Sequence, residues 1–223
     1  MDTHEAPENH MTARRLHRFN SLFLAIFIVA HIATHLSGLW GIETYNAVQN
    51  GLRIIYRYPP VEIMVLASAA FQALLGAKLL ISAIRRGVVG IWHWIQITSG
   101  AIFLIFLLEH LIALGFARLT FGLDTNFYWP ASVMSGPPFT YYFVPYYFLG
   151  VLSLFVHVGV ALRFTLVDRG KFKAAKIIFW TITLLGTAIS GLIVSTLLGA
   201  FFEINLPTEW VKYLRAFYPA YDG

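Results

Sequence analysis

Five apolar runs, each long enough to cross a lipid bilayer as a helix, divide this chain from end to end. They cover residues 19–40, 61–84, 91–116, 142–166 and 177–202. A hydrocarbon core about 30 Å thick needs about 20 helical residues, and in lipid only helices and closed barrels satisfy every backbone hydrogen bond. The sequence therefore predicts an all-α fold, an integral membrane bundle of five transmembrane helices.

The composition excludes several other classes of protein. Hydrophobic residues make up 58% of the 223 residues and charged residues only 12%, which is not the composition of an ordinary soluble domain. The net charge of +5 comes from basic residues at the ends of the runs, so it indicates membrane orientation rather than a nucleic-acid partner. The chain has no cysteine, which excludes disulfides, thiolate iron–sulfur ligation and thiol catalysis.

The basic residues are divided unequally between the two sides of the predicted bundle. The richer side, which includes the N-terminus, has Arg14, Arg15, Arg18, Lys78, Arg85, Arg86, Arg163, Arg169, Lys171, Lys173 and Lys176. The other side has Arg53, Arg57, Arg118, Lys212 and Arg215. Because lysine and arginine are enriched in cytoplasmic loops, we expect a cytoplasmic N-terminus and a multi-pass protein of the bacterial inner membrane.

The segments outside the runs are assigned as follows. Residues 1–13 are polar and are predicted to form a disordered cytoplasmic tail, so that 14–223 form a single transmembrane domain. On the outer side, 43–56 and the segment after Pro207 have the apolar spacing of short interfacial helices. Their aromatic side chains are expected to anchor the membrane boundary, in particular those of Trp210, Tyr213, Phe217 and Tyr218.

Four histidines lie at membrane depth in these runs: His31, His35, His110 and His157. An ionisable side chain is costly there and by default marks a functional site, so these residues favour a cofactor or metal site over a purely structural bundle. Counting residues from the inner edge places His35 level with His110 and His31 level with His157. A modest helix tilt would also allow His31 to pair with His110.

The histidines are candidate axial ligands of haem b, which needs two imidazoles facing each other across the iron. Glu109, next to His110, raises the alternative of a bare metal ion held by the same four histidines. Successive helical residues point about 100° apart, so Glu109 and His110 do not easily bind one ion. No residue of the chain is nominated as catalytic.

A second polar group lies at the inner edge of the bundle. His17, Arg18 and Ser21 open the first run, and Trp92 and Gln96 open the third. Hydrogen-bond donors beside an aromatic ring are suited to the carbonyl groups of a quinone, so these five residues are quinone candidates. Ordinary interfacial capping and snorkelling would explain each of them equally well.

The order of these residues resembles the five-helix cytochrome b membrane anchor of succinate:quinone and fumarate:quinone oxidoreductases. The resemblance covers about residues 14–202 and depends on the spacing of the histidines. Its segments are Arg14-Arg15-Leu16-His17, a histidine about 14 residues later, Ile95-Gln96-Ile97-Thr98-Ser99-Gly100, Leu108-Glu109-His110, and Leu149-Gly150-Val151-Leu152-Ser153 followed by His157.

The resemblance implies two stacked haems b, each held by two histidines on different helices. His31 and His110 match the pair of the outer haem, and His157 matches one ligand of the inner haem. The position of its partner reads Phe71-Gln72-Ala73 and has no histidine. The expected cofactors are therefore one haem b or two, with His35 available for another pairing, together with quinone.

The resemblance also implies partners. An anchor of this family contacts membrane lipid and quinone and docks a flavoprotein and an iron–sulfur subunit on its cytoplasmic face, so the chain would be a quinone-reactive or non-catalytic subunit of an oxidoreductase. The alternative is a stand-alone haem or metal membrane protein, such as a quinone-linked oxidase or an accessory subunit of another complex. The aromatic loops of the outer side favour this alternative.

Overall fold

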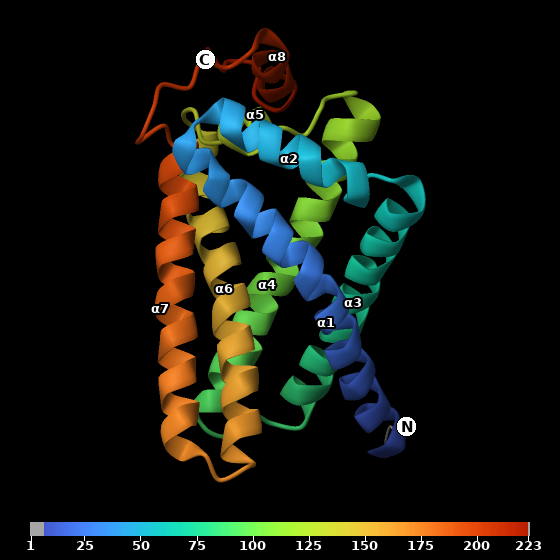
Figure 1. Ribbon diagram of the computed structural model, residues 1–223. Helices are drawn as coiled ribbons and strands as arrows, with labels where there is room; N and C mark the ends of the chain where they lie inside the picture. Colours follow the sequence, from blue (N-terminus) through green and yellow to red (C-terminus); the bar gives the residue numbers. More distant parts are fainter. Residues whose placement is uncertain (1–6, 223) are drawn as a thin grey trace.

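A computed structural model describes residues 7–222, with only the backbone for 7–11, and this part of the chain is helical without a β-strand (Figure 1). Five helices are long and apolar enough to cross a membrane. They are α1 (Pro7–Ser37), α3 (Pro59–Arg85), α4 (Ile91–Gly115), α6 (Phe139–Val167) and α7 (Phe172–Leu197). The predicted all-α membrane bundle is confirmed, and each predicted run overlaps one of these helices, although the run 177–202 continues beyond the end of α7 at Leu197.

The ends of the helices follow from proline and glycine. Pro7 is the first residue of α1, a position where its missing N–H costs nothing. Residues 7–13, assigned above to a tail, are thus part of α1, and residues 1–6 lie outside the described residues. Pro59 opens α3 in the same way. Gly87 and Gly90, both with positive φ, form the tight turn between α3 and α4.

Three of the long helices form a closely packed group. α6 packs along α7 and against α4. Two glycines of this group allow the close approach: the Phe106 ring of α4 fills the place that a Cβ would take on Gly150, and Phe155 of α6 does the same at Gly186 of α7. Small residues at membrane helix interfaces have this role in general.

The first membrane helix lies apart from that group. In Figure 1, α1 runs obliquely across the bundle, and it packs mainly on α3 and on the short helix α2 (Ile42–Tyr56). α1 and α4 are not closely packed against each other. The two termini lie at opposite ends of the bundle, as five crossings require (Figure 1). We call the end opposite the N-terminus the outer end.

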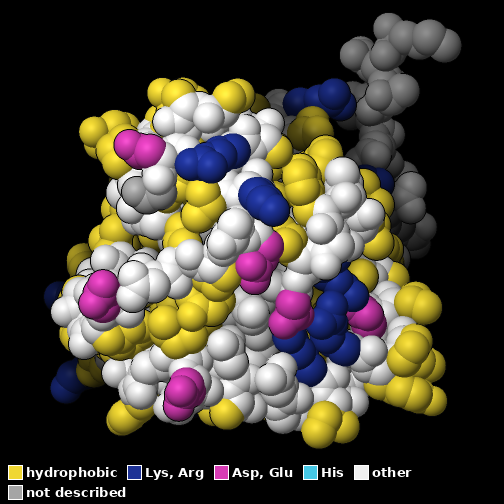
Figure 2. Space-filling model, turned by 90° about the horizontal axis from the view of Figure 1, so that it is seen from above, with side chains coloured by type: hydrophobic (Ala, Val, Ile, Leu, Met, Phe, Trp, Pro, Cys, Tyr) yellow, Lys and Arg dark blue, Asp and Glu magenta, His cyan; other side chains and the backbone are white. Residues whose placement is uncertain are grey.

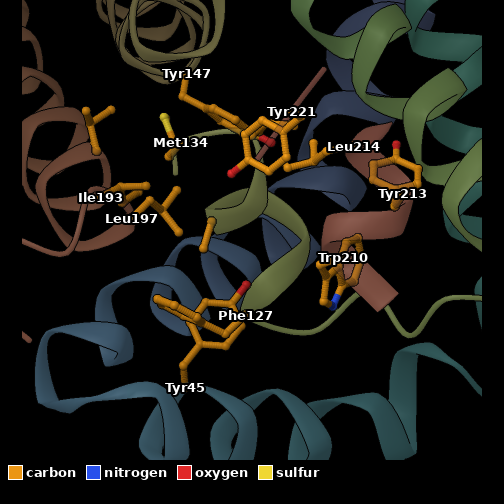
Figure 3. Close-up of a cluster of buried hydrophobic side chains, with 13 residues drawn as sticks. Tyr45, Phe127, Met134, Tyr147, Ile193, Leu197, Trp210, Tyr213, Leu214 and Tyr221 are labelled. Atoms are coloured by element: carbon orange, nitrogen blue, oxygen red, sulfur yellow. The ribbon is translucent and has the colours of Figure 1, made fainter. Parts of the chain in front are cut away.

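Short helices cover the outer end and form what we call the outer cap. It consists of η1 (Gly38–Trp40), α2, η2 (Phe116–Thr120), α5 (Tyr128–Ser132), α8 (Thr208–Phe217) and their loops. Its centre is a hydrophobic cluster in which Trp210, Phe127 and Leu214 are almost completely buried (Figure 3). The expected short helices of this side are therefore present, and they pack on one another as a small core.

This packing changes the role of two aromatic side chains. Trp210 and Tyr213 were expected at the membrane boundary, but they are only 1% and 7% exposed because α8 folds back onto the loop between α4 and α6. The expectation of boundary anchors was wrong for these two residues. Phe217 and Tyr218 on the same segment are exposed.

Polar contacts hold α2 to the loop that follows α4. Arg53 forms an ion pair with Asp124 at 2.9 Å, and the Gln49 amide donates to the backbone oxygen of Thr125 at 3.1 Å. Arg57 lies 3.4 Å from the same carboxylate. Figure 2, a view onto the cap, shows such a group of basic side chains with acidic ones beside it. The cap is thus fixed by charge pairing as well as by its aromatic core.

Candidate cofactor site

Three of the four membrane-depth histidines lie together, and we call them the histidine cluster. His31 and His35 are one turn apart on α1, so they share a face of the helix, and their ring centroids are 4.8 Å apart. The ring of His110 on α4 lies 6.0 Å from that of His31. Of the predicted pairings, the structure brings the rings of His31 and His110 together across the space between α1 and α4.

Aromatic side chains of the bundle enclose this cluster. Phe27 stacks on His31 at 5.5 Å, and Phe106 stacks on His110 at 5.7 Å. Both phenylalanines are one turn before their histidine on the same helix. Their rings give the two imidazoles an apolar setting.

Two further aromatic residues come from the outer cap and were not among the predicted site residues. The Tyr45 ring lies 5.5 Å from His35, and the Trp129 ring lies 5.2 Å from His110. Tyr45 is 2% exposed, and burial raises its pKa well above the ordinary value of a tyrosine. Both residues lie on segments that the sequence marks only as aromatic, so local sequence gave no signal that they would close the site.

One polar atom of the cluster lacks a partner. The Nδ1 atom of His35 is buried and has no hydrogen bond in the described part of the chain. Buried polar atoms almost always have a partner, and an orphan costs about 1–3 kcal/mol. Such an atom beside two further imidazoles indicates a site built to receive another group.

His157 has a different environment from the histidine cluster. Its Nδ1 lies 3.1 Å from the backbone oxygen of Gln96, and its Nε2 lies 3.1 Å from the side-chain amide of the same residue. A Cβ added to Gly100 would lie only 2.9 Å from the His157 ring. Both ring nitrogens are therefore engaged, and the ring lies directly on the backbone of α4.

Gln72, at the position expected to supply the second ligand of the inner haem, is also engaged in a hydrogen bond. The Asn20 amide of α1 donates to the Gln72 side-chain oxygen of α3 at 2.8 Å and lies 2.9 Å from the Ser68 backbone oxygen. Gln72 thus joins α1 to α3. Polar pairs between helices, rather than two facing imidazoles, fill the inner half of the bundle.

The five quinone candidates do not form one group. Trp92 and Gln96 share the face of α4 toward α6, where the Arg163 guanidinium lies 3.7 Å above the Trp92 ring. The Nε2 atom of His17 lies 3.8 Å from the place of a Cβ on Gly76 of α3.

The other two quinone candidates lie apart from these. Arg18 and Ser21 are exposed, and the Ser21 hydroxyl donates to the Arg18 backbone oxygen at 2.7 Å. A serine hydroxyl that is engaged by its own helix is less available to a ligand. Trp92, Gln96 and His17 are therefore the members of the set that face the inside of the bundle.

A bare metal site finds no support among the described side chains. Within residues 12–222, no three histidine, aspartate or glutamate side chains converge as metal ligands. The Glu109 carboxylate accepts a hydrogen bond from the Tyr142 hydroxyl at 2.5 Å, so it is joined to α6 instead of to the histidine cluster. The structure thus separates Glu109 from His110, as their adjacent positions on a helix predict.

The pair His31 and His110 fits the requirements of an iron held by two imidazoles. Metal–imidazole bonds are about 2 Å long, so two such rings on opposite sides of one metal have centroids about 6 Å apart. The observed separation is 6.0 Å. The residues at His157 do not fit a second group of this kind.

Comparison with known proteins assigns no family. No family model, no curated protein and no solved structure matches this chain. The chemistry of the site therefore carries the inference of function.

Proposed function

We propose that this chain is a haem b-binding electron-transfer subunit of a membrane, similar to the cytochrome b anchor of succinate:quinone oxidoreductases. The observation that supports it best is the 6.0 Å separation of the His31 and His110 rings at membrane depth. Two imidazoles on separate helices would hold the iron of a low-spin b-type haem. The haem, when bound, supplies one-electron redox chemistry.

The protein residues supply ligation and a dry environment. His31 and His110 would hold the iron, while Phe27 and Phe106 cover the sides of the two rings. Tyr45 and Trp129 close the outer end of the site and keep water from it. Burial and axial ligand identity are the protein's main means of setting a haem potential.

We propose one haem and not two. His157 has both ring nitrogens engaged by Gln96, and the opposite position on α3 is Gln72, hydrogen-bonded to Asn20. Since a second iron would need to break these contacts and still lack an imidazole on α3, a single haem at the outer position is the better assignment.

Quinone exchange is proposed at the inner end, where Trp92 and Gln96 lie on α4. The Gln96 side-chain oxygen is buried without a hydrogen-bond partner in the described structure, so it could accept a hydrogen bond from the hydroxyl of a quinol, while a donor to a quinone carbonyl would come from the Trp92 indole or from His17. His17 of α1 lies beside Gly76 of α3 at the same end of the bundle. These groups offer the donor and the aromatic surface that a quinone head requires.

A second candidate function differs in its partners. As an electron-transfer anchor, the chain would dock a flavoprotein and an iron–sulfur subunit at the end where the N-terminus lies. As a stand-alone haem protein it would need neither. The outer cap favours the second candidate, because Tyr45 and Trp129 join an elaborate structure at the end away from those docking subunits. Purification from native membranes distinguishes the two by the presence or absence of flavin and iron.

The test of haem binding is a reduced-minus-oxidised spectrum of the full chain, purified after expression with ample haem. We expect a low-spin b-type spectrum and about one haem per chain. His31→Ala and His110→Ala should each lower that ratio, with part of the haem retained in His31→Ala because His35 lies one turn away. A well-folded protein without a low-spin haem spectrum would contradict the proposal.

A further inference from the structure

A basic pocket lies at the inner end of the bundle, and none of the five quinone candidates lines it. Its volume is about 270 Å³. The lining comes from three helices and one turn, with Arg14 on α1, Arg86 after α3, Val88 and Val89 in the turn, and His93 and Ile97 on α4.

Among the side chains of residues 12–222, none balances the positive charge of this pocket. No acidic residue lines it, and neither Arg14 nor Arg86 is in an ion pair within residues 12–222. Arg14 lies close enough to Arg86 and Arg18 to be repelled by both. Arg86 donates to the Ser82 hydroxyl at 2.5 Å, which anchors its guanidinium beside the pocket. Like charges gathered in this way would be stabilised by a bound anion.

The other walls of the pocket are apolar. Val88, Val89 and Ile97 contribute them, and Val89 is 84% exposed. α4 begins beside the pocket at Ile91 and has no side-chain cap, so its first backbone N–H groups add to the positive potential. A ligand that fits both surfaces carries an anionic oxygen group at one end and hydrocarbon at the other.

We propose that this pocket binds an anionic phospholipid of the surrounding membrane, with its phosphate between Arg14 and Arg86 and its acyl chains along Val89 and Ile97. A guanidinium matches the oxygens of a phosphate with two parallel hydrogen bonds. Basic pockets between membrane helices commonly hold such headgroups. The location is right for this ligand, since Arg14 and Arg86 lie at the ends of membrane helices, where headgroups are found.

The experiment uses the full chain in bilayers of phosphatidylcholine with a minor share of phosphatidylglycerol, followed by native mass spectrometry of the lipids that stay bound. Wild-type protein should retain phosphatidylglycerol in preference to phosphatidylcholine. The double variant R14Q/R86Q should lose about fivefold of this preference for each guanidinium removed. The matched control R15Q/R85Q changes the neighbouring exposed arginines outside the pocket and should keep the preference.

A further variant, Ala83→Phe, fills the pocket without changing its charge and should also abolish the preference. If R14Q/R86Q fails to fold, as judged by helical circular dichroism, the lipid preference of Ala83→Phe tests the pocket instead. Equal loss in R15Q/R85Q would mean general surface attraction and would overturn the proposal. The proposal would also be overturned if the wild-type protein showed no lipid preference, or if soluble glycerol phosphate at equal concentration displaced the lipid.

Discussion

At the scale of single residues, the sequence predicted which histidines lie in the membrane but not what each one contacts. The residue count placed His110 level with His35, whereas the resemblance paired His110 with His31, and the rings of His31 and His110 lie 6.0 Å apart. The contact of His157 with Gln96 was not predictable, because it depends on how α6 is rotated against α4. Depth along a helix follows from counting residues, whereas rotation about its axis is fixed only by packing between helices.

The first prediction compares two histidine variants. His110→Ala removes the only ligand candidate that α4 supplies to the cluster, so the haem-to-protein ratio should fall to near zero. His157→Ala should keep that ratio and lower the free energy of unfolding by about 1–3 kcal/mol, because Gln96 loses its partner. Pyridine haemochrome assays and thermal unfolding in detergent measure both. Haem loss from His157→Ala with retention in His110→Ala would refute the assignment.

A second residue-scale prediction concerns alkaline pH. Burial raises the pKa of Tyr45 above its ordinary value of about 10, since the phenolate would lose its hydration, and Tyr56 and Tyr147 add to the effect. The unfolded chain therefore releases this proton first, so the stabilisation is complete below about pH 10 and decreases above it. Tyr45→Phe should flatten that decrease in denaturant titrations. Exposed Tyr58 is the control, and Tyr58→Phe should leave the decrease unchanged.

At the scale of helices, the sequence predicted five spans, and the structure has one helix for each. Hydropathy is sufficient for this, because lipid allows few alternatives to a helix. Hydropathy does not predict which helices pack against each other. The closest approaches depend on single glycines under aromatic rings, such as Gly150 under Phe106, and hydropathy does not register which face of a helix a glycine occupies.

A matched pair of glycine variants tests this packing. In Gly150→Ala the new Cβ meets the Phe106 ring, so the free energy of unfolding should fall by about 1–3 kcal/mol. Gly191 has nothing within 4 Å of the place of a Cβ, so Gly191→Ala should be neutral or stabilising by up to about 1 kcal/mol. Unfolding midpoints in one detergent provide the comparison. Equal effects would show that α4 and α6 are not packed through Gly150.

At the scale of the whole molecule, the outer cap is the part that sequence reasoning described least well. Its helices were expected at the membrane boundary, but α2, α5 and α8 pack into a shared core around Trp210. The local sequence around an aromatic residue does not distinguish a place at the membrane boundary from a place in a small core. The contacts that separate them join segments far apart in the chain.

Trp210 and Trp40 give a direct test of the cap. Trp210 is 1% exposed and Trp40 is 75% exposed. Trp210→Ala should lower the free energy of unfolding by about 3–5 kcal/mol, as large truncations in cores do, whereas Trp40→Ala should change it by less than about 1 kcal/mol. Limited proteolysis should also cut the cap of Trp210→Ala faster. Similar results for both variants would argue against a packed cap.

The separation of α1 from the group of α4, α6 and α7 has a consequence for biogenesis. The ribosome delivers His31 to the membrane well before His110, and the early helix α1 has only α2 and α3 to pack against until α4 is inserted. His31 and His110 can therefore meet only after α4 has been inserted. The proposed haem would bind at that late step, because it needs one imidazole from each of these two helices.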